Sequence, residues 1–249
     1  MDLNCLKRIP LFSSLSDQQL ARLLANSQQR RYGRSSCVVH EGQQTDTFYV
    51  ILSGRVKVSM HDEDGKEIIL AKLGASEFFG EMGLFDQRAR SASVETLETC
   101  EILRFSHAGF MACFKDNADL SSVIIRKLVD RLRAANRKIG SLALLDVAGR
   151  VARYFLDHAQ ERDGEWVVPS VSSNVEIARM VGASREMVSR VVSELRESDC
   201  IRYEKRTVFL LGRLKLEAVA QVRKSSIADQ GARFVQRPKR TPIVSSINR

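Results

Sequence analysis

Residues 117–145, NADLSSVIIRKLVDRLRAANRKIGSLALL, predict a helix about 40 Å long around which the rest of the chain is organised. The stretch has no proline, and its single glycine, Gly140, lies near the end. Apolar residues recur at alternating spacings of three and four, the pattern of a coiled-coil stripe. Because this stripe is narrow and charged residues surround it, we expect two copies of the helix to pair in a parallel homodimer. An ordinary core helix of a monomer is the alternative. The stripe residues are Ile125, Leu128, Leu132, Ala135, Ile139 and Leu142.

Length and charge limit the kind of protein. The chain has 249 residues, of which 44% are hydrophobic, so it is long enough to bury the cores of about two domains. The formal net charge is +9, but residues 213–249 carry nine Lys or Arg against two acidic residues, an excess of +7 in the tail. No apolar run approaches the roughly 18 residues of a membrane span, and the first residues lack a secretory signal. We expect a cytoplasmic protein without a membrane segment, and the charge favours a polyanionic partner without proving one.

The usual signatures of metal sites and of common enzymes are missing. The histidines are scattered, and the sequence contains neither a P-loop nor a nucleophile-elbow motif. The cysteines are scattered too, without the close pairs that zinc or iron–sulfur sites need. We therefore expect reduced thiols, no metal and no enzymatic activity. The cysteines are Cys5, Cys37, Cys100, Cys113 and Cys200.

From about residue 36 to residue 105 the sequence changes to short β-like runs separated by turn residues. In RVKVSM (residues 55–60) apolar and polar residues alternate strictly, as in an antiparallel strand with one buried and one solvated face. Asp64 and Gly65 then supply a hairpin turn. Many short strands at intervals of about ten residues predict a β jelly roll or a similar barrel.

Residues 79–94, FGEMGLFDQRARSASV, concentrate the side chains suited to binding a sugar phosphate. Glycines let backbone N–H groups approach an anion, the carboxylate of Glu81 can accept from a pair of ribose hydroxyls, and Arg90 offers a planar fork to a phosphate. The same loop could be a plain turn with a solvated salt bridge.

GEMGLF (residues 80–85) followed by RSASV (residues 90–94) resembles the phosphate-binding cassette of cyclic-nucleotide-binding domains. The chain up to about Arg213 resembles the cyclic-AMP receptor protein / fumarate-nitrate regulator family of bacterial transcription regulators. That resemblance implies that Glu81 takes the ribose 2′-hydroxyl, that Arg90 pairs with the cyclic phosphate, and that Ser91 and nearby N–H groups complete the cradle. The nucleotide-binding residues implied in this way are Gly80, Glu81, Met82, Arg90, Ser91, Ala92, Ala135 and Asn136.

The resemblance also locates the contacts to the base. In the family, two adjacent positions on the long helix hydrogen-bond the purine, and here they are Ala135 and Asn136. Cyclic-AMP binders carry hydroxyl residues at both positions, so Ala135 removes one donor, while the amide of Asn136 can pair with adenine or guanine. Cyclic AMP is the first expectation for the ligand, with cyclic GMP or cyclic di-GMP as alternatives.

Residues 175–197 read as helix, tight turn and helix, with Gly182 in the turn and Ser184 placed to cap the second helix. The second helix has a buried valine-rich face and a polar face. The two-stranded pattern CIRYEKRTVFLL (residues 200–211) follows, which is the order of a winged helix-turn-helix, and the second helix of such a module enters the major groove of double-stranded DNA.

The second helix, SREMVSRVVSEL (residues 184–195), is similar to the recognition helix of the cyclic-AMP receptor protein family, which implies base readout by Arg185, Glu186 and Arg190 at a TGTGA-type half-site. The chemistry agrees, because arginine can pair with guanine and glutamate can accept from cytosine. The fumarate-nitrate regulator's clustered N-terminal cysteines are absent here, so iron–sulfur sensing is not expected. The DNA-binding residues predicted in this way are Ser184, Arg185, Glu186, Ser189 and Arg190.

Together these patterns predict an α+β chain with a cyclic-nucleotide-binding β jelly roll, a long dimerisation helix and a C-terminal winged helix-turn-helix. We expect a transcription regulator gated by a cyclic nucleotide and acting with RNA polymerase. A constitutive DNA-binding protein with a vestigial pocket, a regulator responding to a cyclic dinucleotide and a regulatory subunit of another protein are the alternatives. The expected boundaries are 1–116 for the sensor, 117–145 for the helix, 146–213 for the DNA-binding domain and 214–249 for a basic, disordered tail. That tail is either a DNA-anchoring arm or only a solubilising extension.

Overall fold

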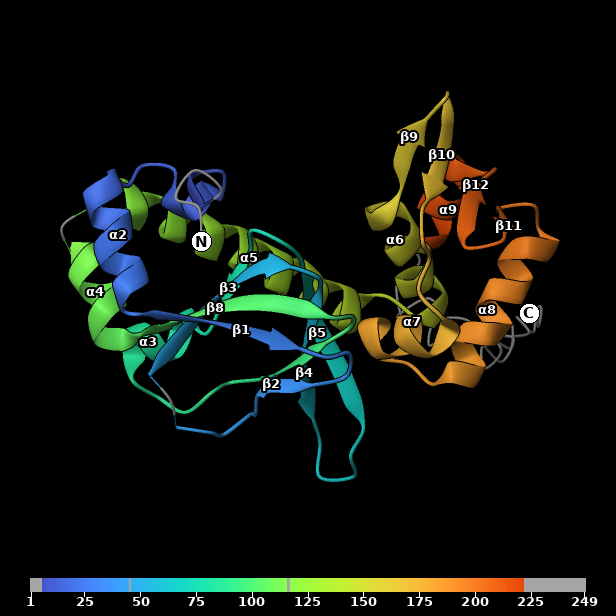
Figure 1. Ribbon diagram of the computed structural model, residues 1–249. Helices are drawn as coiled ribbons and strands as arrows, with labels where there is room; N and C mark the ends of the chain where they lie inside the picture. The colour runs from blue at the N-terminus through green and yellow to red at the C-terminus, as the bar shows by residue number, and fades with distance from the viewer. Residues whose placement is uncertain (1–5, 45, 116, 222–249) are drawn as a thin grey trace, which may run out of the picture. The chain divides into compact units, whose positions relative to one another are not determined.

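The computed structural model describes residues 6–44, 46–115 and 117–221, and they form two compact units (Figure 1). Of these described residues, the first unit takes those up to 139 together with 172–185, and the second takes 140–171 and 186–221. Within the described residues, no helix is long and apolar enough to cross a membrane. The prediction for the basic tail falls mainly on residues 222–249, outside the described residues.

Two four-stranded antiparallel sheets form the body of the first unit, with strand orders β1-β8-β3-β6 and β2-β7-β4-β5. The jelly roll predicted from the spacing of the strands is confirmed. The strands are β1 Ser27–Tyr32, β2 Cys37–Val39, β3 Thr47–Ser53, β4 Val56–His61, β5 Glu67–Leu73, β6 Phe78–Phe79, β7 Ser93–Thr96 and β8 Cys100–Ser106.

Helices cover one end of this roll. The 3-10 helix η1 (Pro10–Phe12), α2 (Asp17–Ala25) and α4 (His107–Lys115) pack on it through a core that includes Phe12, Phe48 and Phe110. The rings of Phe48 and Phe110 lie 4.2 Å apart between centroids. A second buried cluster, around Ile51, Val56 and Ile102, fills the space between the two sheets.

The β4–β5 hairpin turns at Asp64 and Gly65 as predicted, with the Gly65 N–H donating to the Asp62 carbonyl at 3.0 Å. The expected solvated face of β4 was wrong. Lys57 and Ser59 are buried, whereas Met60 on the opposite face is exposed. A bulge contributes to this pattern, because Val58 pairs with Ala71 and the next residue of β4, Ser59, pairs with Ile69, so one residue of β5 is left over.

The long helix is α5, Ala118–Leu144. Its first turns pack against the sensor core through Leu120 and Ile124, which are fully buried. Most of the predicted stripe is open in the single chain: Leu132 is 61% exposed and Ile139 is 64% exposed. An apolar stripe left in water along one face of a helix is what a second copy of the chain would cover.

The second unit contains α6 (Val147–His158), most of α8 (Arg185–Glu197) and a four-stranded antiparallel sheet. Asp146 caps α6 by accepting from the Gly149 N–H at 2.7 Å. The predicted valine-rich face of α8 is buried, which agrees with the prediction of a winged helix-turn-helix. The sheet has the order β11-β12-β10-β9, and its strands, followed by the last helix, are β9 Gln160–Arg162, β10 Glu165–Val168, β11 Ile201–Glu204, β12 Thr207–Leu210 and α9 Arg213–Val219.

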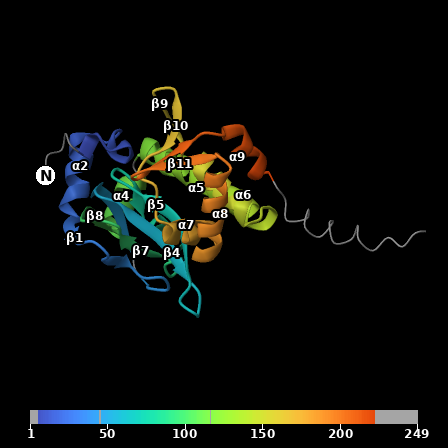
Figure 2. The ribbon, with the colours of Figure 1, turned by 90° about the vertical axis from the view of Figure 1, so that its right-hand side faces the viewer.

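One helix of the predicted helix-turn-helix belongs to the first unit. It is α7, Asn174–Val181, which is capped by Ser173 and ends at Gly182 in the left-handed conformation, with φ of 64°. In the first unit α7 contacts strand β5, and Figures 1 and 2 both show it beside that strand.

Candidate functional site

The cassette predicted at residues 79–94 folds as a tight turn into the short helix α3, Glu81–Asp86. Gly80 precedes it with φ of 84°, a conformation that favours glycine. A Cβ at Gly80 would lie 2.9 Å from both the Thr47 carbonyl oxygen and Arg90 Nη1. The glycine is therefore required for the turn to approach β3 and the Arg90 side chain this closely.

Arg90 lies beneath this turn with only 6% of its surface exposed. Its Nη1 donates to the Gly80 carbonyl at 2.7 Å, and its Nη2 donates to the carbonyl of Thr47. The guanidinium carbon lies 5.8 Å from the centroid of the Tyr49 ring. Burial lowers the pKa of Arg90, against the opposing influence of nearby Tyr49 and acidic groups.

The third nitrogen of this guanidinium, Nε of Arg90, is buried and has no hydrogen-bond partner within the part of the chain that the structure describes. A buried donor left without a partner costs free energy unless a ligand accepts from it. Arg90 is thus a buried cation with a free donor next to the glycine turn, and an anion fits this arrangement.

Glu81, the first residue of α3, is also buried, at 5% exposure. Its Oε1 accepts from Nη1 of Arg131 on α5 at 2.7 Å, and Nη2 of Arg131 donates to the carbonyl of Phe78. The guanidinium of Arg131 stacks over the Phe78 ring at 4.8 Å. The long helix therefore supplies a cation that pairs with the cassette carboxylate.

Sequence reasoning missed Arg131 and treated it as one of the charges surrounding the stripe. The available signal was the spacing of basic residues on one side of α5, because Lys127 and Arg131 are four apart and Lys138 follows two turns later. Lys127 pairs with Glu77 at 2.7 Å, and Lys138 donates to the carbonyl of Ile69. Burial lowers the pKa of Lys138. These contacts fix α5 along the cassette side of the roll.

The structure places the other predicted pocket residues as follows. Ser91 is exposed, and its Oγ lies 3.5 Å from Sδ of Met82, so these two side chains meet at the cassette. Ala92 is partly buried beside them. Ala135 and Asn136 are exposed on α5, one turn beyond Arg131. Among the contacts described, none joins them to the cassette of the same chain.

The predicted DNA-reading side chains lie along α8. Glu186 and Arg190 are exposed, Ser189 is partly exposed, and Val188 and Val191 on the other face are buried. A cavity of about 430 Å³ lies within the second unit along α8 and the start of α6. Its lining includes two cations, Arg150 and Arg190, and two anions, Asp146 and Glu194, so the exposed face of α8 borders a hollow of mixed charge. Ser184 and Arg185 are exposed where the helix begins.

No cluster of three or more residues able to hold a metal ion occurs among the residues that the structure describes. Four cysteines lie within this part of the chain, and none of them forms a disulfide with another: Cys37, Cys100, Cys113 and Cys200.

Two family models match separate parts of the chain. Residues 29–117 match the family model of the cyclic nucleotide-binding domain, and residues 149–219 match that of the Crp-like helix-turn-helix domain. The first match includes the whole cassette, and the second includes α7, α8 and the strands of the wing.

Among curated proteins, the chain is 36% identical over 202 residues to the cAMP-activated global transcriptional regulator Vfr of Pseudomonas aeruginosa, covering 78% of this chain and 94% of that one. It is 34% identical over 200 residues to the cAMP-activated global transcriptional regulator CRP of Haemophilus influenzae, covering 79% and 89%.

Solved structures are also similar to this chain. The c-di-GMP responsive global regulator CLP of Xanthomonas campestris is 32% identical, with a TM-score of 0.64 over 79% of this chain and 100% of that chain. A mutant of CooA from Carboxydothermus hydrogenoformans, at 22% identity, has a TM-score of 0.72 over 88% of this chain and 97% of that chain and shares the fold.

Proposed function

Because the chain belongs to the cyclic-AMP receptor protein / fumarate-nitrate regulator family of bacterial transcription regulators, we propose that its sensor binds a cyclic purine nucleotide and that this ligand controls its affinity for DNA. The observation that carries the proposal is Arg90, a buried cation whose Nε lacks a partner within the described residues and which lies under the glycine turn of the cassette. A phosphate anion supplies the acceptor that this nitrogen lacks.

Each part of the cassette has a distinct task in this proposal. Arg90 and the backbone around Gly80, Ser91 and Ala92 hold the cyclic phosphate, with Met82 beside Ser91. Glu81 accepts from the ribose hydroxyl while Arg131 donates to its Oε1. Since the Glu81–Arg131 pair joins the ribose end of the pocket to α5, ligand binding acts directly on the long helix.

The base end supports a specific ligand preference. Ala135 and Asn136 are exposed in the single chain, and we propose that they reach the purine bound in the pocket of a homodimer. Cyclic AMP is the first candidate, since Vfr and the CRP relatives are cAMP-activated. Cyclic di-GMP is the second candidate, because the position of Ala135 lacks a hydroxyl and the similar regulator CLP is c-di-GMP responsive.

The homodimer is proposed on the exposed stripe of α5, where Ile125, Leu132 and Ile139 are each more than half exposed. Pairing two such helices sets two recognition helices on successive turns of DNA, about 34 Å apart, and predicts a palindromic operator. Arg185, Glu186 and Arg190 are the proposed base readers of each half-site, with Ser184 and Ser189 contacting its backbone.

The protein is a DNA-binding transcription regulator, and we propose that it acts by binding rather than by catalysis, in the cytoplasm and together with RNA polymerase. The functional boundaries we propose remain 1–116 for the sensor, 117–145 for the dimerisation helix, 146–213 for the DNA-binding domain and 214–249 for a DNA-anchoring tail.

Calorimetry tests the ligand directly. Full-length protein is titrated with cyclic AMP, cyclic GMP and cyclic di-GMP, and operator binding is then measured with and without each nucleotide. Arg90→Leu should abolish nucleotide binding, whereas Arg88→Leu, an exposed arginine of the same loop, should leave it unchanged. Nucleotide binding that survives the loss of Arg90 would refute the pocket.

A further inference from the structure

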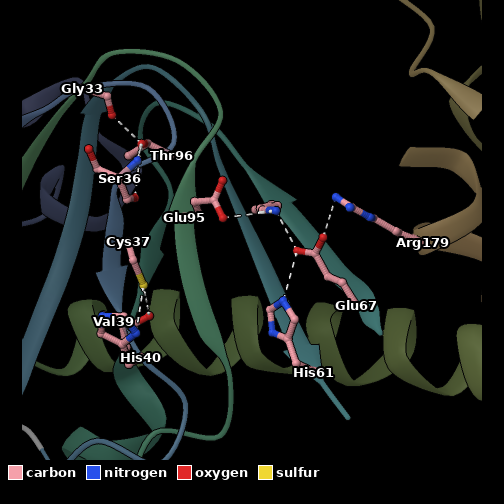
Figure 3. A network of polar contacts seen from close by, with 11 residues as sticks. Gly33, Ser36, Cys37, Val39, His40, His61, Glu67, Glu95, Thr96 and Arg179 are labelled. Carbon is pink, nitrogen blue, oxygen red and sulfur yellow. Dashed lines mark hydrogen bonds and ion pairs between the residues drawn. The ribbon is translucent and has the colours of Figure 1, made fainter. Parts of the chain in front are cut away.

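The outer face of the β4–β5 hairpin carries buried charges that the nucleotide pocket does not use. Glu67 (Figure 3) lies at the start of β5 and has a side chain only 6% exposed. Its Oε1 lies 2.7 Å from Nζ of Lys57 on β4. Lys57 is in turn 3.3 Å from Glu95 on β7. Charges are rarely buried on the outer side of a sheet unless another element covers them.

Helix α7 contacts this face inside the first unit and completes the charge network. Nη1 of Arg179, in the last turn of α7, lies 2.7 Å from Oε2 of Glu67, as Figure 3 shows. On the same helix, Glu176 accepts from Nζ of Lys72 at 2.9 Å. The hydroxyl of Ser172, just before α7, accepts from the same Nζ at 2.8 Å.

The two ion pairs have complementary signs. Strand β5 presents an anion, Glu67, and a cation, Lys72, while α7 presents a cation, Arg179, and an anion, Glu176. On a regular strand Glu67 and Lys72 would face opposite sides, because their spacing of five is odd. The bulge at β5 places both on the outer face, where they lie opposite His61 and Lys57 of β4. The charges thus define one position and one orientation for the helix.

We propose that this contact is a latch between the sensor and the first helix of the helix-turn-helix, and that it withholds the helix from DNA. The latch is the set of pairs Glu67–Arg179 and Lys72–Glu176. The first helix of such a motif crosses the phosphate backbone of bound DNA. In the latch, the carboxylate of Glu67 pairs with Arg179, which a DNA phosphate would otherwise contact. DNA and the sensor therefore compete for the same cation.

The burial of the partners makes the latch reversible. When Arg179 leaves, Glu67 keeps Lys57 at 2.7 Å, so no isolated charge remains buried in the sensor. The side chain of Arg179 is 43% exposed, and those of Lys72 and Glu176 are 28% and 32% exposed, so all three can be rehydrated at small cost. This inference goes beyond the proposed nucleotide site, from which it is separate in residues and in test.

The first test uses Lys72→Glu, Glu176→Lys and the double variant K72E/E176K in full-length protein without nucleotide. Each single variant places like charges across the latch and should raise affinity for operator DNA roughly three- to tenfold. The double variant restores opposite charges and should return toward the wild-type affinity. Lys72→Glu is decisive, because it adds negative charge to a DNA-binding protein, and bulk electrostatics alone would weaken binding.

The second test distinguishes two effects of opening the latch: release of helix α7 and release of the Arg179 side chain for a phosphate contact. Glu67→Gln frees Arg179, so operator affinity should rise and the slope of log K against log salt should steepen by about 0.9, the value for one additional phosphate contact. Arg179→Gln also opens the latch but removes the cation, so its salt slope should stay at the wild-type value. Circular dichroism and calorimetry with nucleotide confirm that each variant is folded.

The latch is refuted if Lys72→Glu and Glu67→Gln leave nucleotide-free operator affinity within twofold of wild type or lower it. A protein that binds none of the tested nucleotides but gains DNA affinity in these variants would refute the proposed ligand and retain the latch. If the protein binds a nucleotide but no latch variant changes its DNA affinity, the latch is refuted and the proposed ligand is retained.

Discussion

The exposed stripe of α5 allows the dimer contact to be quantified. We consider Leu132→Ala together with Ile139→Ala, which shorten two stripe residues that are 61% and 64% exposed in the single chain. Burial of a whole leucine or isoleucine side chain is worth about 2 kcal/mol. Covering the exposed fractions by a second helix is therefore worth about 2.5 kcal/mol per subunit and about 5 kcal/mol per dimer.

This loss corresponds to a dissociation constant raised by roughly three to four orders of magnitude. Alanine preserves helix propensity, so α5 itself should remain folded. Sedimentation velocity over a dilution series measures the monomer–dimer equilibrium, and the stability of the sensor is followed separately by thermal unfolding. The matched control is Arg133→Ala with Arg137→Ala, two exposed positions on the same helix that lie off the stripe.

An unchanged dissociation constant in L132A/I139A, or an equal change in the arginine control, would show that α5 does not pair through this stripe. A shift of less than tenfold would mean that the stripe is at most the rim of the interface.

Three further predictions concern the base, the DNA and the charge network. Ala135→Thr should tighten cyclic AMP by about 1 kcal/mol, roughly fivefold by calorimetry, because it restores one hydrogen bond; indifference at this position would exclude it from the base site. Arg185→Ala should weaken operator binding by about 1–3 kcal/mol and reduce the sequence preference at one base pair. The control Arg162→Ala, in the β9 hairpin, should change neither quantity, and both variants are measured on a library of single-base operator variants. For Glu67, burial raises the pKa, but hydrogen bonds from Lys57 and Ser59 and the charges of Lys57 and Arg179 outweigh it, so the folded-state pKa lies below the usual 4.5. The stabilisation from this carboxylate is present above pH 4.5 and is lost as the pH falls through the folded-state value, so the melting-temperature gap between wild type and Glu67→Gln should be largest at neutral pH and shrink in acid. The comparison is repeated in the His61→Gln background, since His61 lies 3.9 Å from Glu67, and a gap independent of pH would contradict the ion pair.

Several elements follow from sequence because their causes are local. The hairpin at Asp64 and Gly65 requires only turn residues between two alternating runs, and the buried face of α8 requires only the 3.6-residue period. The stripe of α5 is readable for the same reason, since a helix repeats its faces at fixed intervals. The cassette glycines were assigned to a close backbone approach because they lack a side chain, and the structure adds that Gly80 also has a positive φ of 84°.

The partners of charged side chains were decided by the tertiary structure. Nothing in the spacing of residues 81 and 131 indicates that Glu81 and Arg131 lie 2.7 Å apart, because they are brought together by the path of the whole jelly roll. The alternation of apolar and polar residues in β4 predicted that Lys57 faces solvent, but Lys57 is buried. A bulge changes the pairing of β4 with β5, and helix α7, more than a hundred residues later in the chain, packs against β5. Local pattern determines which face of an element a side chain occupies, but long-range packing determines whether that face meets water, a ligand or an opposite charge.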